Sequence, residues 1–316
     1  MRNVAFLVLA AACWGTGTVV SKQAVAQIAP LTLLPIQLAA SVGFLLVLTR
    51  ARGISLPAGR DGRLLGRLGL LNPGLAYALS LIGLAEITAS LSVLLWATEP
   101  LFILALAAVV LGDRVGVAIL APSAIAIAGL GLVVLDPAAS GSTMGIVLTV
   151  VGVAVCAVYT VATRKWLLGS DSTLGVVLAQ QLYALGFAVV VVVALAATGR
   201  QMLPAQVSAA GLVSAAASGL LYYAFAYSFY LSALRHVRAS IAAASFYLIP
   251  VFGVAGGWLA GERLEPLQWL GAMLVILSVA AITIRVARPA DEPADQPSSA
   301  DASAQMALNP SEARRS

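Results

Sequence analysis

Residues 89–114 read ASLSVLLWATEPLFILALAAVVLGDR, and residues 239–263 read ASIAAASFYLIPVFGVAGGWLAGER. Both stretches begin with Ala-Ser, carry a proline at Pro100 or Pro250, and end in Gly-acid-Arg after a single one-residue gap. Almost every residue between these markers is apolar. Because the markers recur in the same order and spacing, the chain contains an internal repeat, and this repeat decides the fold.

The repeat extends beyond these two stretches. A shift of 142 residues pairs Thr18 with Thr160 and Lys22 with Arg164. A shift of 150 residues adds the pairs Tyr77 with Tyr227, Leu81 with Leu231, Leu84 with Leu234 and Phe102 with Phe252. We therefore predict two copies of one unit, residues 1–136 and 143–288. Residues 289–316 are rich in Pro, Ala, Ser and Asp and predict a disordered tail.

The composition excludes several classes of protein. Of 316 residues, 61% are hydrophobic and only 10% are charged, whereas a soluble domain has about 25% charged residues. A soluble enzyme, a nucleic-acid-binding domain and a disordered chain are therefore excluded. The net charge of +5 forms no basic face, because the charges stand at the ends of apolar runs. The two cysteines lie inside apolar runs and predict no disulfide framework or metal site.

Ten apolar stretches are each about long enough to cross a bilayer, which takes about 20 residues. We expect all ten to be α-helices, because runs such as Val189–Val193 lack the alternation of a membrane β-barrel. The longest polar loop is predicted from Arg50 to Arg67. The ten stretches are 4–21, 30–49, 68–85, 90–111, 117–135, 144–163, 174–197, 208–231, 240–260 and 267–286.

The basic residues predict the orientation. With ten spans and a cytoplasmic N-terminus, 15 Lys and Arg residues fall on the cytoplasmic side, and only Lys22, Arg200 and Arg263 fall on the other. By the positive-inside rule, both termini are expected in the cytoplasm, with the chain in the cytoplasmic (inner) membrane. The first span resembles a secretory signal, but we expect it to be retained, because it is long for one and has a counterpart in the second repeat.

Each repeat contains five of the ten predicted spans. Because five is an odd number, the two repeats must cross the membrane in opposite directions. This inverted-repeat arrangement is typical of secondary transporters. With its Trp14-Gly15 pair and the duplicated Ala-Ser, Pro and Gly-acid-Arg markers, the chain resembles the drug/metabolite transporter superfamily, in its EamA-type ten-helix branch. The resemblance covers residues 1–288 and implies export of amino acids, other metabolites or drugs. Many relatives carry an arginine in the second span, where this chain has Gln37.

Glu99 is the only acidic residue deep within a predicted span. A carboxylate in the middle of a bilayer costs about 2.5 kcal/mol or more, so a compensating role is expected. We hypothesise that Glu99 binds a proton or a substrate ammonium group. The alternative is that it stays protonated or is hydrogen-bonded to neighbouring helices. Ile249 stands at the matching position of the second repeat, so the scaffold itself needs no carboxylate there.

The two mid-span prolines predict breaks in their helices. Each removes one main-chain hydrogen bond, at the carbonyl of Trp96 for Pro100 and of Phe246 for Pro250. Broken helices mark binding sites in many transporters. The alternative is a kink that only shapes helix packing, and in both cases the prolines support the geometry and are not ligands.

Polar and aromatic side chains recur at helical spacing on several spans, and these faces are expected to converge on the interior. In proteins that resemble this one, such helices surround a central cavity. The predicted substrate-binding residues are Trp14, Thr18, Gln37, Tyr77, Trp96, Glu99, Tyr159, Gln181 and Tyr227. The alternative for each is helix packing or an interhelical hydrogen bond. Lys22, at the end of a span, is expected to reach the lipid headgroups.

The leading hypothesis is a secondary active transporter that exports small amphipathic metabolites, such as amino acids, by alternating access with proton coupling at Glu99. The alternatives are an uncoupled facilitator or exchanger, or a multidrug efflux protein. An intramembrane enzyme is disfavoured, because the chain has one histidine, His236, in a predicted loop. The sequence contains no metal or phosphate-binding motif. We therefore expect no cofactor and no nucleic-acid partner, with lipid and a small molecule as partners and a monomer or homodimer as the assembly.

Overall fold

The computed structural model describes residues 2–111, 117–134, 141–167, 172–199, 207–234 and 248–286. The Gly112-Asp113-Arg114 and Ala239-Ser240 markers, His236 and the predicted tail lie outside the described residues. So does Phe246, whose carbonyl was expected to be freed by Pro250.

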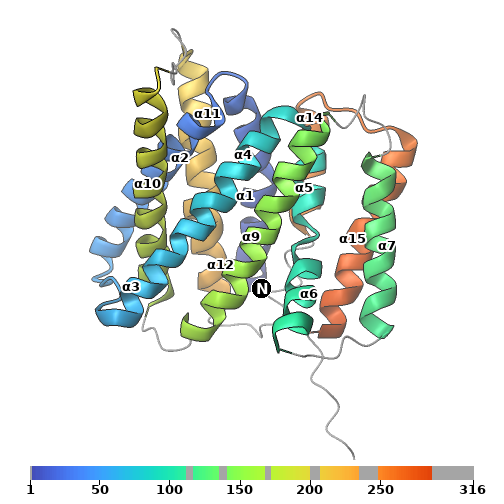
Figure 1. The fold of residues 1–316 in the computed structure, drawn as a ribbon, viewed down its shortest axis with the longest axis horizontal. Coiled ribbons are helices and arrows are strands. Elements are labelled where there is room, and N and C mark those ends of the chain that lie inside the picture. Colours follow the sequence, from blue (N-terminus) through green and yellow to red (C-terminus); the bar gives the residue numbers. More distant parts are fainter. Residues whose placement is uncertain are drawn as a thin grey trace, which may run out of the picture.

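Each repeat supplies five helical segments (Figure 1). The third segment of each repeat is one run that changes its winding part-way, and the fourth segment of the first repeat is interrupted. The first repeat contains α1 (Arg2–Val25), α2 (Pro30–Ala51), the run α3 (Gly59–Arg67), η1 (Leu68–Leu70), η2 (Leu71–Leu75) and α4 (Ala76–Glu86), then α5 (Ala89–Trp96), α6 (Glu99–Leu111) and α7 (Val117–Val134). The second contains α9 (Thr143–Leu167), α10 (Thr173–Ala197), the run α11 (Ala209–Gly219), η3 (Leu220–Phe225) and α12 (Ala226–Leu234), then α14 (Leu248–Leu259) and α15 (Pro266–Val286).

The predicted all-α fold with ten spans is confirmed. In the part of the chain that the structure describes, 6 helices are long and apolar enough to cross a membrane, and four shorter apolar helices occupy the remaining predicted spans. One boundary was wrong: α3 occupies residues 59–67 of the predicted loop. The error arose because its sequence, GRDGRLLGR, is polar, whereas only its buried side, which includes Leu65, packs into the protein.

The two repeats interlock instead of forming separate bundles. Their helices pair in a pattern that repeats when the two copies are exchanged, as a two-fold axis between them requires. For example, α1 packs on the run α11–α12, and its counterpart α9 packs on α4. The pairs α2 with α10, α5 with α14 and α7 with α15 join equivalent helices, with α7 and α15 side by side at one end of the bundle (Figure 1).

The third helix of each repeat contains a π-helical turn at the same place. These turns are η2 and η3, and a shift of 150 residues brings Leu71–Leu75 onto residues 221–225 of η3. In the first repeat the turn holds Asn72 in a non-helical conformation, with φ −144° and ψ 120°. Because both copies keep the turn, the duplication preserves this irregularity as well as the regular helices.

Glycines allow the repeats to approach each other closely, and they do so symmetrically. A Cβ atom on Gly219 would lie 2.6 Å from the Cα of Gln37 on α2. A Cβ atom on Gly69 would collide with the carbonyl of Gln180 on α10. Gly69 and Gly219 are 150 residues apart, so one contact is made twice, with the roles of the repeats exchanged.

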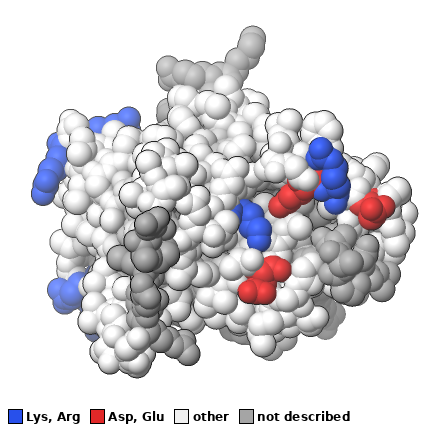
Figure 2. All heavy atoms as spheres, turned by 90° about the horizontal axis from the view of Figure 1, so that it is seen from above, with Lys and Arg blue, Asp and Glu red and all other residues white. Residues whose placement is uncertain are grey.

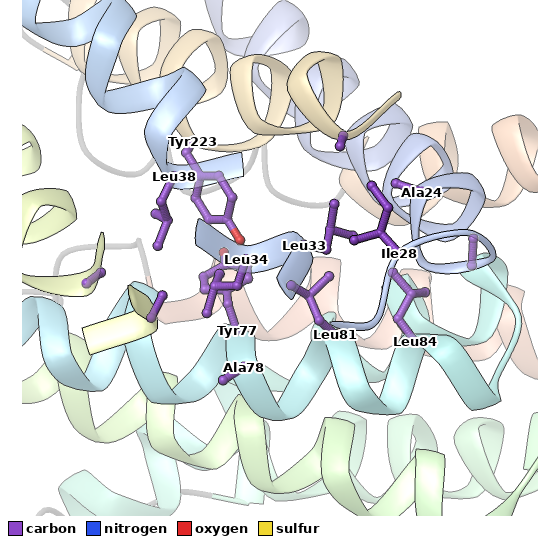
Figure 3. Close-up of a cluster of buried hydrophobic side chains, with 14 of the residues drawn as sticks. Ala24, Ile28, Leu33, Leu34, Leu38, Tyr77, Ala78, Leu81, Leu84 and Tyr223 are labelled. Carbon is purple, nitrogen blue, oxygen red and sulfur yellow. The ribbon is translucent and has the colours of Figure 1, made fainter. Parts of the chain in front are cut away.

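The largest buried cluster gathers side chains from both repeats around α4 (Figure 3). Leu33, Leu34 and Leu38 from α2 face Tyr77 and Leu81 from α4, and Tyr223 of η3 closes the cluster. Leu33 and Leu38 are fully buried, at 0% exposure. Tyr77, Leu81, Leu84 and Tyr223 of this cluster also line the cavity described below.

The symmetric glycine contact predicts a pair of contrasting substitutions. Gly219→Ala should destabilise the protein by about 1–3 kcal/mol, because the added methyl group meets the main chain of α2, which cannot move aside. Gly43→Ala is the matched control, since a Cβ there meets nothing within 4 Å. Thermal unfolding in detergent would compare the two. Equal unfolding temperatures for both variants would contradict the close inter-repeat contact.

Candidate functional site

A small, partly open cavity lies between the two repeats. Its walls come from α1, α4, α5 and the π-helical turn η3, and in the described part of the chain its lining includes no charged side chain. The lining residues are Thr18, Ser21, Tyr77, Ser80, Leu81, Leu84, Ser92, Trp96, Tyr222 and Tyr223. The cavity has a volume of only about 20 Å³, which is enough for about one water molecule.

Aromatic rings form one side of the cavity, with Tyr77 at their centre. Tyr77 stacks on Trp96 with ring centroids 5.1 Å apart and an interplanar angle of 22°. Its edge contacts reach Tyr222 at 5.2 Å and Tyr223 at 5.1 Å, and Figure 3 shows Tyr77 and Tyr223 approaching each other. Such a set of rings offers flat apolar surface together with hydroxyl groups.

Hydroxyl groups form another part of the wall. Ser80 is only 5% exposed, and among the described residues its Oγ has no hydrogen-bond partner. Thr18 Oγ1 donates to the carbonyl of Trp14 within its own helix, at 3.2 Å. Because an unpaired buried hydroxyl is costly, Ser80 marks a place where a water molecule or a polar group of a ligand would be stabilised.

The fourth span is interrupted directly beside the cavity. The helix α5 ends at Trp96 and α6 begins at Glu99, with Ala97 and Thr98 between them. Pro100 has no N–H group that could donate to the carbonyl of Trp96. Between the two helices, Thr98 Oγ1 donates to the carbonyl of Leu95 at 2.6 Å. The span therefore consists of two half-helices. Pro250 is buried near the start of the described part of the ninth span.

Glu99 lies at the first position of α6, outside the cavity lining. Its Oε1 accepts a hydrogen bond from Thr160 Oγ1 of α9 at 3.0 Å, and Cys156 lies beside the same carboxyl group. A carboxylate is favoured at this end of a helix by the helix dipole. Thr160 is the counterpart of Thr18 in the second repeat, so this threonine is present in both repeats. Glu99, its partner, has no acidic counterpart in the second repeat.

Gln37 and Gln181 form buried hydrogen-bond networks behind the cavity wall. Gln37 is fully buried, and its Nε2 donates to Ser21 at 3.0 Å and to Ser218 at 2.8 Å. Gln181 accepts from Ser41 Oγ at 2.6 Å and donates to the carbonyl of Tyr223, in the π-helical turn, at 3.1 Å. Both side chains therefore position residues that line the cavity and do not line it themselves.

The remaining predicted residues lie in contacts next to the cavity. Trp14 and Tyr227 meet edge to face, with centroids 5.3 Å apart, and Tyr159 donates to Gln180 Oε1 at 2.8 Å. Of the nine predicted substrate-binding residues, Thr18, Tyr77 and Trp96 line the cavity. The other six are not among the lining residues.

The comparisons with known proteins agree with this architecture. A family model described as the EamA-like transporter family matches residues 1–135 and again residues 143–284. The chain belongs to the EamA-like transporter family. This EamA-like transporter is thus an integral multi-pass membrane protein that moves small molecules, and the predicted inverted repeat is confirmed.

Solved structures support the same fold for this EamA-like transporter, and 17 chains match it. One of them, described only as "Crystal structure of protein", superimposes with a TM-score of 0.62 at 16% sequence identity, covering 90% of this chain and 96% of the other. At this identity the likeness shows the fold alone. A search of curated proteins finds no match.

The predicted substrate-binding residues of this EamA-like transporter leave out Ser21 and Ser92, which lie on the predicted inward-facing stripes, and sequence reasoning missed Ser80 and Tyr222 altogether. Ser80 could have been found, because it follows Tyr77 by three residues and so shares its helix face. Tyr222 gave no such signal. It lies in η3, where a π-helical turn changes the direction of successive side chains.

Two buried serines of this EamA-like transporter predict opposite responses to the same substitution. Ser41→Ala removes the donor to Gln181 and should lower stability by about 0.6–1.7 kcal/mol, as membrane hydrogen bonds do. Ser80→Ala should leave stability unchanged or raise it, because its Oγ is unpaired within the described chain. Thermal unfolding in detergent measures both. A larger loss for Ser80→Ala than for Ser41→Ala would show that Ser80 has a structural partner.

Proposed function

We propose that this protein is a secondary active transporter that exports small amphipathic organic metabolites, such as amino acids, by alternating access. We further propose that Glu99 carries the coupling proton. The chain would lie in the cytoplasmic membrane with both termini in the cytoplasm. Lys22 and Arg263 would then be on the opposite side, as the distribution of basic residues favours.

The observation that carries this proposal is the small volume of the cavity between the inverted repeats. Pockets that bind small organic molecules usually hold about 300–1,000 Å³, whereas this cavity offers about 20 Å³. A substrate can occupy it only after the walls separate. Because those walls are supplied by both repeats, a relative movement of the repeats would open the cavity, and this movement is alternating access.

The chemistry of the wall favours an amphipathic substrate. The rings of Tyr77 and Trp96 would contact an apolar group, and the hydroxyls of Ser21, Ser80 and Ser92 would bind a polar group. Since the lining has no charged side chain in the described chain, a substrate whose charges balance, such as a zwitterionic amino acid, fits better than a strongly charged one.

Proton coupling at Glu99 is supported by its place and its partner. Glu99 follows the break between α5 and α6, so its surroundings change whenever one half-helix moves relative to the other. Thr160, on the other repeat, donates to its carboxyl group at 3.0 Å. A hydroxyl can donate to a carboxylate and can also accept from a protonated carboxyl, so the site suits both states of the acid.

An uncoupled facilitator or exchanger is the second candidate. The observation that favours it is the position of Glu99 outside the cavity lining, because an acid that never meets the substrate could serve structure alone. The two candidates differ in whether substrate flux requires a proton to move with it.

The coupling proposal predicts the behaviour of Glu99→Gln. Purified protein would be reconstituted into liposomes that contain a pH-sensitive dye, and each of the twenty amino acids would be tested under an imposed pH gradient. Glu99→Gln should abolish gradient-driven accumulation and substrate-dependent proton movement. It should retain exchange of labelled for unlabelled substrate, because the cavity is intact.

Glu265→Gln is the matched control, since Glu265 is an exposed acid just before α15. It should transport like the unmodified protein. Unchanged proton-coupled flux in Glu99→Gln would remove Glu99 from the mechanism and favour the facilitator. Absence of flux for all twenty amino acids in the unmodified protein would instead contradict the proposed substrate class.

A further inference from the structure

Glu262 joins the second repeat to the first at the end of the bundle above the cavity. Its carboxylate accepts hydrogen bonds from the main-chain N–H of Ala89 at 2.6 Å, the N–H of Ser90 at 2.9 Å and the hydroxyl of Ser90 at 2.6 Å. These groups begin α5, where main-chain N–H groups lack partners within the helix. Glu262 thus caps a helix that belongs to the other repeat.

The turn before Glu262 directs this carboxylate toward the start of α5. Gly261 adopts φ 101°, a left-handed conformation that suits glycine. The N–H of Glu262 bonds the carbonyl of Gly257 at 2.9 Å, and the N–H of Gly261 bonds that of Trp258 at 3.1 Å. This pair of bonds ends α14 and folds the chain back over it. A Cβ atom on Gly257 would collide with both Glu262 and Ser90, so the glycine makes room for the cap.

Lys22 makes a second connection between helices at the same end of the molecule, in addition to that of Glu262. It does not extend toward lipid headgroups as the sequence suggested, but donates from Nζ to the carbonyls of Leu84 at 2.8 Å and Ala85 at 3.1 Å. These carbonyls end α4, where a positive charge is favoured by the helix dipole. Glu262 and Glu86 both attract Lys22 electrostatically. Figure 2 shows acidic and basic side chains close together on this face, within a largely uncharged surface.

Lys22 and Glu262 both bind helices that line the cavity. Ser21 precedes Lys22 in the chain and lines the cavity, as does Leu84, whose carbonyl Lys22 binds. The helix that Glu262 caps, α5, contributes Ser92 and Trp96 to the lining. The interruption at Ala97 and Thr98 separates α5 from α6, so α5 can tilt as a unit once its capped end is released.

We propose that Glu262 and Lys22 are the two latches of a gate that closes the cavity on this face of the membrane. Lys22 holds α1 to α4, and Glu262 holds α5 to the turn between α14 and α15. Both latches bind main-chain groups at helix ends, which water can satisfy when the helices part. The gate can therefore open without leaving buried polar groups unpaired. This inference rests on the proposed alternating access and extends it to named residues.

The test measures access to the cavity, not transport. In a full-length chain with Cys13→Ala and Cys156→Ala, Ser80→Cys places one thiol in the cavity wall. The full chain is reconstituted into liposomes, and a membrane-impermeant methanethiosulfonate reagent is added to one side at a time. A separate Ala26→Cys protein identifies the face that carries the latches, because Ala26 is exposed directly after α1. We expect slow labelling of Ser80→Cys in the otherwise unmodified background.

Releasing a latch should accelerate this labelling from the latch face several-fold. Glu262→Ala, Lys22→Met and Gly257→Ala should each do so, and Glu262→Gln, which keeps one acceptor oxygen, should have an intermediate effect. Glu265→Gln is the matched control, because Glu265 is an exposed acid in the same turn. It should label at the background rate.

Two results would overturn the proposal. One is labelling of the latch variants at the rate of Glu265→Gln. The other is an equal acceleration from both faces, which would indicate general loosening of the fold. Glu262→Gln keeps the size and shape of the side chain, so an informative variant remains if Glu262→Ala does not fold. The assay uses no substrate and no pH gradient, so its failure is distinct from failure of the proposed transport activity.

Discussion

The structure depends on close contact between the main chains of two repeats at glycine. Lipid tails are as apolar as leucine, so helices in a bilayer associate through tight packing and hydrogen bonds and not through burial from water. Gly219 against Gln37 and Gly69 against Gln180 provide this packing twice, once in each direction. The repeats consequently share one interior. The cavity forms where helices of both repeats meet, and any movement between them changes its size.

Several buried polar groups inside the bundle connect helices by hydrogen bonds. Gln181 stabilises the irregular turn η3 by binding the carbonyl of Tyr223, and Gln37 ties two serines from different helices. Ser80, in contrast, is unpaired in the described residues and lines the cavity. The interruption before Glu99 separates α5 from α6. In the proposed gate, Glu262 holds the start of α5 and Lys22 holds the end of α4. The residues proposed for coupling and gating thus lie at, or bind to, the ends of helices.

The sequence predicts the helices and the duplication well, because both follow from apolar length and from identities at fixed spacing. It predicts the site less well. Periodicity assigns Gln37 and Gln181 to an inward face but does not say whether they meet a substrate or another helix, and the structure gives them partners. The helix α3 was not predicted, because its sequence is polar and only one of its sides is buried. The duplicated Ala-Ser and Gly-acid markers were visible, yet their contact, Glu262 with Ser90, joins residues 172 positions apart in different repeats.

The opposite orientation of the two repeats can be measured at equivalent loops of the two copies. In a chain with Cys13→Ala and Cys156→Ala, single cysteines would be placed at Ala51 and Thr198, which are exposed at the ends of α2 and α10. A membrane-impermeant maleimide would then be applied to intact cells and to inverted vesicles. Because the repeats are inverted, the two positions should be labelled from opposite sides of the membrane. Labelling of both from the same side would contradict the inverted repeat and the gate and transport cycle derived from it.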